Sequence, residues 1–378
     1  MNQFVKRCLN GIILTIKLNS KMKRILFLFV LVNSIVAAHP QSLADSMLVQ
    51  YCKKVFYETV LPYEAEMHGG SVIVSETQTG IVKALINFHR HGIDGWSENT
   101  DYNCFIPALN SPLALFLALL DADADPIEEF YTTGVLLDER AGVIIRDWNW
   151  RYGGVGNITL SQACQRSRVA LIEACEKWFV RSQATAAYHL SHTGIYLGDE
   201  DESLTDYQSF CYRYEDTPWQ PLALLGDNDR LKIIQIHMFT SGLANGKLLM
   251  PRMEESDPSV VIYDPMANPE HIEIVRNSML ENVEYGLSKI VKTGVEDVQI
   301  WGFSNVSEPN GTCEQSSLFT GFIEKYTITV TVDMFENSLI RIVPQKIASS
   351  IINYLTNTKI DMSHETDIGT YKPYRAEK

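Results

Sequence analysis

Two serines, Ser111 and Ser167, have the side-chain type that could act as the nucleophile of an acyl-transfer reaction. A serine hydroxyl attacks a carbonyl only when a neighbouring base accepts its proton, and a lysine one helical turn away can be that base if its pKa is lowered. Residues 84–176 include both serines and contain no lysine. We therefore interpret Ser111 as a helix N-cap, followed by Pro112 as the first helical residue.

Histidines, acidic residues and cysteines do not form a recognisable metal motif. His89 and His91 stand two residues apart in a polar stretch, which is typical of solvated histidines. Asp121–Asp125 resembles the start of a calcium loop, but the mid-loop glycine is missing and Thr132 stands where the closing glutamate belongs. No cysteine spacing is typical of zinc, so we predict neither a metal nor a cofactor.

The elements that would hold these side chains follow from the spacing of apolar residues. Residues 113–120 are apolar all round, which predicts a buried central helix. Gly80 fits the turn between two predicted strands, and Gly69-Gly70 ends the first predicted helix. The predicted helices span 43–66, 159–179, 228–245, 270–291 and 337–356, and the predicted strands span 71–75, 81–86, 298–301, 318–322 and 326–332. This order predicts one α+β domain over residues 43–356, followed by a polar C-terminal tail over residues 357–378.

Composition limits the possible partners. The 378 residues include 32 Lys and Arg against 46 Asp and Glu, a formal net charge of −14. Phosphate contacts require a surplus of basic residues, so we expect no nucleic-acid binding. The hydrophobic fraction of 46% is large enough for a folded core.

Residues 1–38 are predicted to be an export leader, with residues 22–38 as the core signal. Basic residues precede the apolar run Ile25–Val32, and Val36–Ala38 offers small residues for cleavage. An even number of cysteines follows the leader, which permits disulfides, while buried free thiols are an equal alternative. We expect an exported, periplasmic protein that stays associated with the inner membrane if the leader is not cleaved.

Five stretches between residues 50 and 345 resemble, in order, the transpeptidase domain of penicillin-binding proteins. They are GGSVIVSETQTGIVKALINF, IPALNSPLALFLALLDADADP, a segment from TTGVLLDERAGVIIRDWN to GNITLSQACQRSRVALIEACEKWF, DRLKIIQIHMFTSGLANGKLLMPRM and SSLFTGFIEKYTITVTV. The resemblance implies a β-lactamase/transpeptidase-like α/β/α sandwich, with a central antiparallel sheet and a buried central helix. The family's enzymes cross-link peptidoglycan through an acyl-serine intermediate.

The resemblance also assigns the first two of the family's three catalytic motifs. Ser-x-x-Lys would place Leu109 at the nucleophile and Pro112 at the lysine. Ser-x-Asn would place Ser167 at the serine and Val169 at the asparagine, with Arg168 interpreted as a surface residue between them. Neither leucine nor proline can supply the chemistry of the first motif.

The third motif, Lys-Thr/Ser-Gly, belongs on a strand beside the catalytic site. The resemblance places Phe303, Ser304 and Asn305 there, with Pro309–Thr312 as an alternative, and neither placement contains a lysine. A literal Lys292-Thr293-Gly294 precedes the expected strand, and we interpret it as a coincidence in a loop.

Loss of the nucleophile, the base, the amide and the cation together favours a catalytically inactive pseudoenzyme. Such a protein would bind a peptidoglycan stem peptide or a cell-wall synthesis protein in an apolar cleft lined by Leu109, Val169 and Phe303. The alternative is an active D,D-transpeptidase of peptidoglycan synthesis that captures β-lactams, with Ser111 or Ser167 as nucleophile and Lys292 as base. An unrelated exported structural protein is the third possibility.

Overall fold

The computed structural model describes residues 46–90, 96–99, 105–107, 111–138, 143–147, 149–179, 188–190, 192–194, 230–306, 314–335 and 340–357. The predicted leader, Leu109, the alternative third motif at 309–312 and the predicted tail after Asn357 lie outside the described residues. In the described part of the chain, no helix combines the length and the apolar character needed to cross a membrane.

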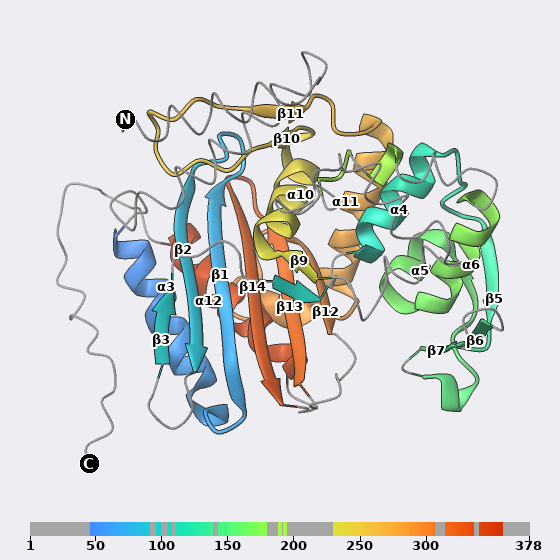
Figure 1. Ribbon diagram of the computed structural model, residues 1–378, viewed down its shortest axis with the longest axis horizontal. Helices are drawn as coiled ribbons and strands as arrows, with labels where there is room; N and C mark the ends of the chain where they lie inside the picture. The colour runs from blue at the N-terminus through green and yellow to red at the C-terminus, as the bar shows by residue number, and fades with distance from the viewer. Residues whose placement is uncertain are drawn as a thin grey trace, which may run out of the picture. The chain divides into compact units, whose positions relative to one another are not determined.

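A six-stranded sheet forms the centre of the fold, and every neighbouring pair of its strands is antiparallel. In sheet order the strands are β12 (Trp301–Val306), β13 (Glu314–Phe322), β14 (Tyr326–Phe335), β1 (Met67–Glu76), β2 (Val82–Arg90) and β3 (Trp96–Asn99). β12 lies at one edge of the sheet, so only one of its sides is paired (Figure 1). The predicted central antiparallel sheet is confirmed.

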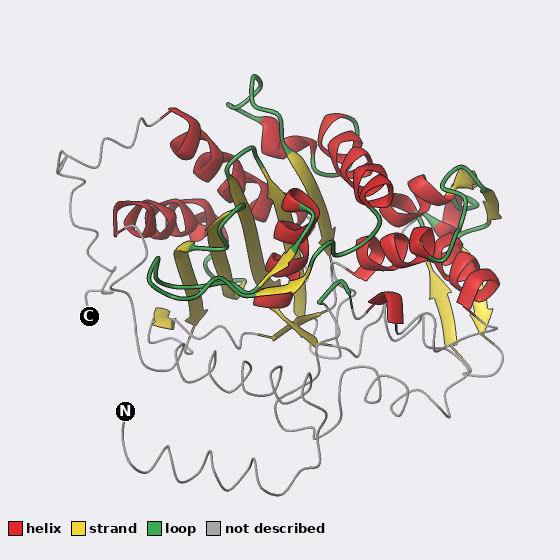
Figure 2. Cartoon of the chain, turned by 90° about the horizontal axis from the view of Figure 1, so that it is seen from above, coloured by secondary structure: helices red, strands yellow, loops and turns green. Residues whose placement is uncertain are grey.

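Helices cover both faces of this sheet (Figure 2). On β14, Ile328, Val330 and Val332 belong to one core with α3 (Ser46–Val60) and α12 (Val343–Asn357). The alternating threonines of β14 point to the opposite face, where α10 (Ile233–Asn245) packs. Threonine and aliphatic residues therefore alternate along this strand because its two faces contact different helices.

A group of helices beside the sheet contains the apolar segment that was predicted to be central. α4 (Ser111–Asp121) is buried from Leu113 to Leu120, as expected, and packs against α5 (Leu160–Arg166), α6 (Arg168–Phe179) and α11 (Pro269–Glu284). The small strands of the fold are β4 (Phe105–Pro107), β5 (Glu129–Thr132), β6 (Val135–Asp138), β7 (Val143–Arg146), β8 (Gly156–Thr159), β9 (Arg230–Lys232), β10 (Leu248–Leu249) and β11 (Val261–Tyr263). Short 3₁₀ turns lie at η1 (Leu61–Tyr63), η2 (Trp150–Tyr152), η3 (Lys289–Lys292) and η4 (Ile340–Ile342).

The glycine pair that was expected to end the first helix instead lies inside β1. A Cβ on Gly70 would come within 2.4 Å of the Thr331 carbonyl oxygen and 2.7 Å of the Phe56 ring. Glycine is therefore required where helix α3 packs its aromatic side chain closely against the sheet. The predicted helix over 43–66 correspondingly ends at Val60.

The helix predicted over 159–179 is two helices. Thr159 caps the first with a complete capping box, as its place in the sequence suggested. Ser167 then takes an extended conformation, with φ −146° and ψ 107°, and separates α5 from α6. The strand predicted over 298–301 likewise begins only at Trp301 and extends to Val306.

Candidate functional site

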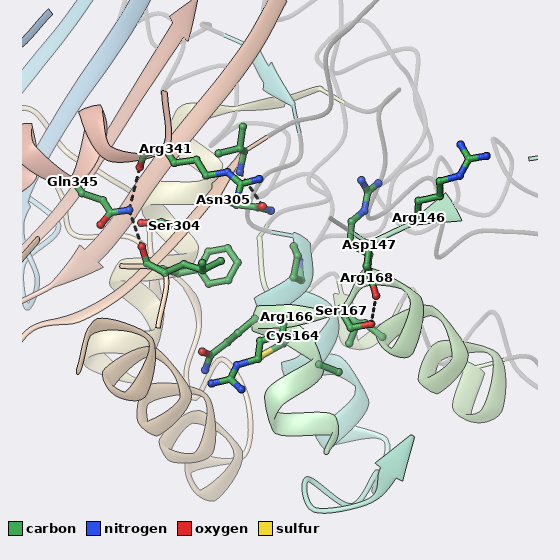
Figure 3. Close-up of a pocket in the computed structure, with 17 residues that line it drawn as sticks. Arg146, Asp147, Cys164, Arg166, Ser167, Arg168, Ser304, Asn305, Arg341 and Gln345 are labelled. Carbon is green, nitrogen blue, oxygen red and sulfur yellow. Dashed lines mark hydrogen bonds between the residues drawn. The ribbon is translucent and has the colours of Figure 1, made fainter. Parts of the chain in front are cut away.

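A cavity of about 130 Å³ opens beside the edge strand β12. Its walls come from the start of α4, the break between α5 and α6, the end of β7, strand β12 and the segment from η4 to α12 (Figure 3). Five of the seven motif positions suggested by the sequence line it, namely Pro112, Ser167, Phe303, Ser304 and Asn305. Val169 is buried in α6 outside the lining, and Leu109 and the side chain of Ser111 lie outside the described residues.

Ser167 is held by two hydrogen bonds. Its hydroxyl donates to Asp147 Oδ2 over 2.6 Å and accepts from the backbone N–H of Ala170 over 3.0 Å. The second contact is an N-cap interaction for helix α6, because it satisfies one of the unpaired amides in the first turn. The serine at this motif position therefore has a structural role that requires no catalysis.

Asp147 was missed by the sequence analysis. It follows β7, is 3% exposed, and accepts a further hydrogen bond of 3.3 Å from the Val169 backbone N–H. Burial raises the pKa of its carboxyl group, and the hydrogen bonds from Ser167 and the helix backbone oppose part of that rise. Its partners lie twenty residues further along the chain, so no local pattern could identify it.

The β12 positions present no ammonium group to the cavity. Phe303 is buried, and the Ser304 hydroxyl accepts a hydrogen bond of 2.9 Å from the hydroxyl of Ser288. The Asn305 side-chain oxygen accepts from the backbone N–H of Val306 over 2.9 Å. These contacts anchor the edge strand and its side chains locally.

Lys292, the base required by the active alternative, lies at the end of η3. Its ammonium group pairs with the Glu284 carboxylate over 2.8 Å. It is absent from the residues that line the cavity. This placement agrees with the interpretation of Lys292-Thr293-Gly294 as a coincidence.

Four arginines also line the cavity, and they come from four different elements: Arg146, Arg166, Arg168 and Arg341. Arg168, which we had interpreted as a surface residue, is half-buried. Of the predicted apolar lining, Phe303 is in place, whereas Val169 is wrong because it lies in α6 outside the cavity; guanidinium groups, which were not expected, line the cavity as well. Sequence reasoning missed the cluster because its members span almost two hundred residues of chain.

Cys164 lines the same cavity without offering a nucleophile. Its thiol is fully buried, and burial raises its pKa to about 12. A thiol that stays protonated at neutral pH is unreactive. Among the residues that the structure describes, no three His, Cys, Asp or Glu side chains gather to hold a metal ion.

No protein-family model and no curated protein matches this sequence, whereas many solved structures do. The apo transpeptidase domain of penicillin-binding protein 3 from Burkholderia pseudomallei is 16% identical, with a TM-score of 0.64 over 85% of this chain and 98% of that chain. A peptidoglycan glycosyltransferase from Burkholderia ambifaria is 17% identical, with a TM-score of 0.64 over 83% and 96%. Penicillin-binding protein 2B from Streptococcus pneumoniae is 11% identical, with a TM-score of 0.65 over 85% and 59%. The chain therefore has the fold of the transpeptidase domains of penicillin-binding proteins, as the sequence resemblance implied.

Proposed function

We propose that this protein is a catalytically inactive, transpeptidase-like protein that binds a cell-wall partner. The partner is a peptidoglycan stem peptide or a protein of cell-wall synthesis. One observation carries the proposal: among the residues that the structure describes, no lysine lines the cavity where five motif positions meet. A serine in this cleft therefore has no lysine amine, within the described part of the lining, to receive its proton and later return it to a leaving group.

The state of Ser167 supports the same proposal. Ser167 is 2% exposed, and its hydroxyl is hydrogen-bonded to both Asp147 and the α6 backbone. A nucleophile must leave such contacts to reach a carbonyl group. Removing a catalytic serine or its base typically costs several orders of magnitude in rate, so the combined differences predict no measurable turnover.

The alternative is an active D,D-transpeptidase with rearranged motifs. The 2.6 Å contact between Ser167 Oγ and the Asp147 carboxylate favours it, because a carboxylate can accept a hydroxyl proton. If Lys292 is the base instead, it must break its ion pair with Glu284 and reach the cavity.

Labelling with a fluorescent penicillin separates these two functions. The full chain is incubated with the reagent beside the transpeptidase domain of Burkholderia pseudomallei penicillin-binding protein 3 as a positive control, and adducts are sought by intact-mass spectrometry. We expect no covalent adduct on this protein and an adduct on the control. An adduct that disappears in Ser111→Ala or Ser167→Ala would establish the alternative.

A binding function requires a second measurement. A synthetic stem pentapeptide is titrated into the full chain by calorimetry and then recovered for mass spectrometry. If the partner is a stem peptide, we expect saturable binding and recovery of the intact peptide. If the partner is a protein of cell-wall synthesis, we expect no binding of the peptide. Loss of the terminal residue from the recovered peptide would contradict the proposed inactivity.

We also propose that residues 1–38 direct export to the periplasm, with residues 43–356 as the binding domain and 357–378 as a tail. Cleavage after Ala38 would give a mature chain that begins at His39. N-terminal sequencing of the protein from the periplasmic fraction tests this. A full-length chain in the membrane fraction would indicate an uncleaved leader, and one in the cytoplasmic fraction would refute export.

A further inference from the structure

The cavity beside β12 has a charge opposite to that of the whole chain. Among the described residues, its lining carries four guanidinium groups and one carboxylate, that of Asp147, whereas the chain has a formal net charge of −14. That carboxylate is already occupied by Ser167 and by the Val169 backbone. Among the described residues of the lining, arginines therefore outnumber carboxylates.

The arginines approach the cavity from two sides. Arg166 and Arg168 flank the break between α5 and α6, while Arg341 comes from η4 on the side of the sheet (Figure 3). Within the described part of the chain, no carboxylate pairs with Arg166 or Arg341, and both are exposed. Exposed guanidinium groups from two sides of the cavity are available to a bound anion.

The same cavity has an apolar wall. Phe303, Leu171 and Leu287 are among the residues that line it. Phe303 and Leu171 are already buried, but Leu287 is 49% exposed, so a ligand with apolar groups would remove Leu287 from water, whereas a bare inorganic anion would not. Planar guanidinium groups bind carboxylates through two parallel hydrogen bonds, which lysine cannot provide.

We propose that this cleft binds an acidic peptide segment, in which glutamate or aspartate carboxylates meet Arg166, Arg168 and Arg341 while neighbouring apolar side chains contact Leu287. This inference rests on the proposed binding function and names the chemistry of its partner. Carboxylates spaced along an extended segment can reach both walls, so a peptide with at least two acidic residues is required. The partner is recognised through charge and apolar contact, without covalent chemistry.

Fluorescence anisotropy with a labelled pentapeptide of alternating glutamate and leucine tests the inference. The matched probe replaces each glutamate with glutamine, and inorganic phosphate serves as a competitor. We expect saturable binding of the acidic peptide and at least about tenfold weaker binding of the glutamine peptide. Binding of the acidic peptide should weaken further as sodium chloride rises from about 0.05 M to about 0.5 M, because salt screens exposed charges.

Arginine variants locate the contact. Arg166→Ala and Arg341→Ala should each weaken binding about three- to tenfold, and Arg341→Lys should weaken it less. Arg151→Ala is the matched control, because Arg151 is exposed on the adjacent turn, near Trp150, but does not line the cavity. Melting temperatures of all variants check that each remains folded.

Three results would overturn the inference. These are equal binding of the two peptides, unchanged binding in both alanine variants, and complete displacement of the peptide by phosphate at equal concentration. A stem peptide that binds wild type and Arg341→Ala equally would keep the proposed function and refute this inference. An active enzyme revealed by penicillin labelling would refute the proposed function, whereas arginine-dependent peptide binding would still support the inference.

Discussion

His237 should make this protein sensitive to acid, although it is not among the residues that line the candidate site. It is 1% exposed on α10, and its ring nitrogens contact Ser75 Oγ over 2.7 Å and Thr329 Oγ1 over 2.9 Å. From Thr329 the hydrogen-bonded network continues to Thr320 and Thr240. The neutral imidazole can donate to one hydroxyl and accept from the other, so it satisfies both partners without a charge.

Burial lowers the pKa of His237 from its usual 6.5 to about 3. In the unfolded chain the same imidazole binds a proton near pH 6.5, so between these two values the unfolded state holds more protons than the folded state. The contribution of the neutral His237 to the free energy of unfolding is therefore fully present above about pH 6.5 and is lost progressively as the pH falls towards 3. One pH unit within this window corresponds to about 1.4 kcal/mol, so acidification from about pH 7.5 to about pH 4.5 should remove about 2–3 kcal/mol.

Urea unfolding of the full chain at those two pH values measures this loss. His237→Gln removes the titrating group, so the variant should be less stable than wild type at neutral pH but should lose about 2–3 kcal/mol less on acidification. Ser75→Ala keeps the imidazole and removes one hydrogen bond, which should cost about 1 kcal/mol while the acid-dependent loss persists. Equal losses in wild type and His237→Gln would refute this account of the network.

Two further variants test the packing and the cleft. Gly70→Ala should lower the free energy of unfolding by about 2 kcal/mol or more, because its Cβ would lie 2.4 Å from the Thr331 oxygen; an unchanged melting temperature would contradict the close packing of α3. Ser167→Ala should cost about 1–3 kcal/mol, because helix α6 loses its N-cap and buried Asp147 loses a donor. If the Ser167→Ala variant has the same free energy of unfolding in urea as wild type, these two contacts do not stabilise the fold.

Parts of the fold could be predicted because local patterns and tertiary packing agree. The Thr–aliphatic alternation of β14 follows from two layers of different polarity, and the all-apolar surface of α4 follows from burial on every side. Gly80 was correctly placed in a turn, where it takes a φ of +70°. The glycines at the start of β1 misled the analysis because their cause is a neighbouring ring, Phe56, which no local pattern reveals.

The cleft was harder to predict because its lining is assembled from distant segments. The resemblance suggested Ser167 and Phe303, which line one cavity, yet their neighbours Asp147 and Arg341 carry no motif. The break at Ser167 was also invisible, since apolar residues continue at helical spacing on both sides of it. Periodicity reports which face is buried, but it does not report where a helix stops and restarts along the same direction.

The contacts of Ser167 and Ser304 separate the demands of the fold from the demands of catalysis. Ser167 caps a helix and holds a buried carboxylate, and Ser304 accepts a hydrogen bond from Ser288. Both hydroxyls would be retained for these reasons in a protein without turnover, because unpaired buried partners destabilise the fold. A hydroxyl at a motif position is therefore weak support for activity here. Arg166 and Arg341, which are exposed and form no ion pair with a described residue, indicate more directly what the cleft binds.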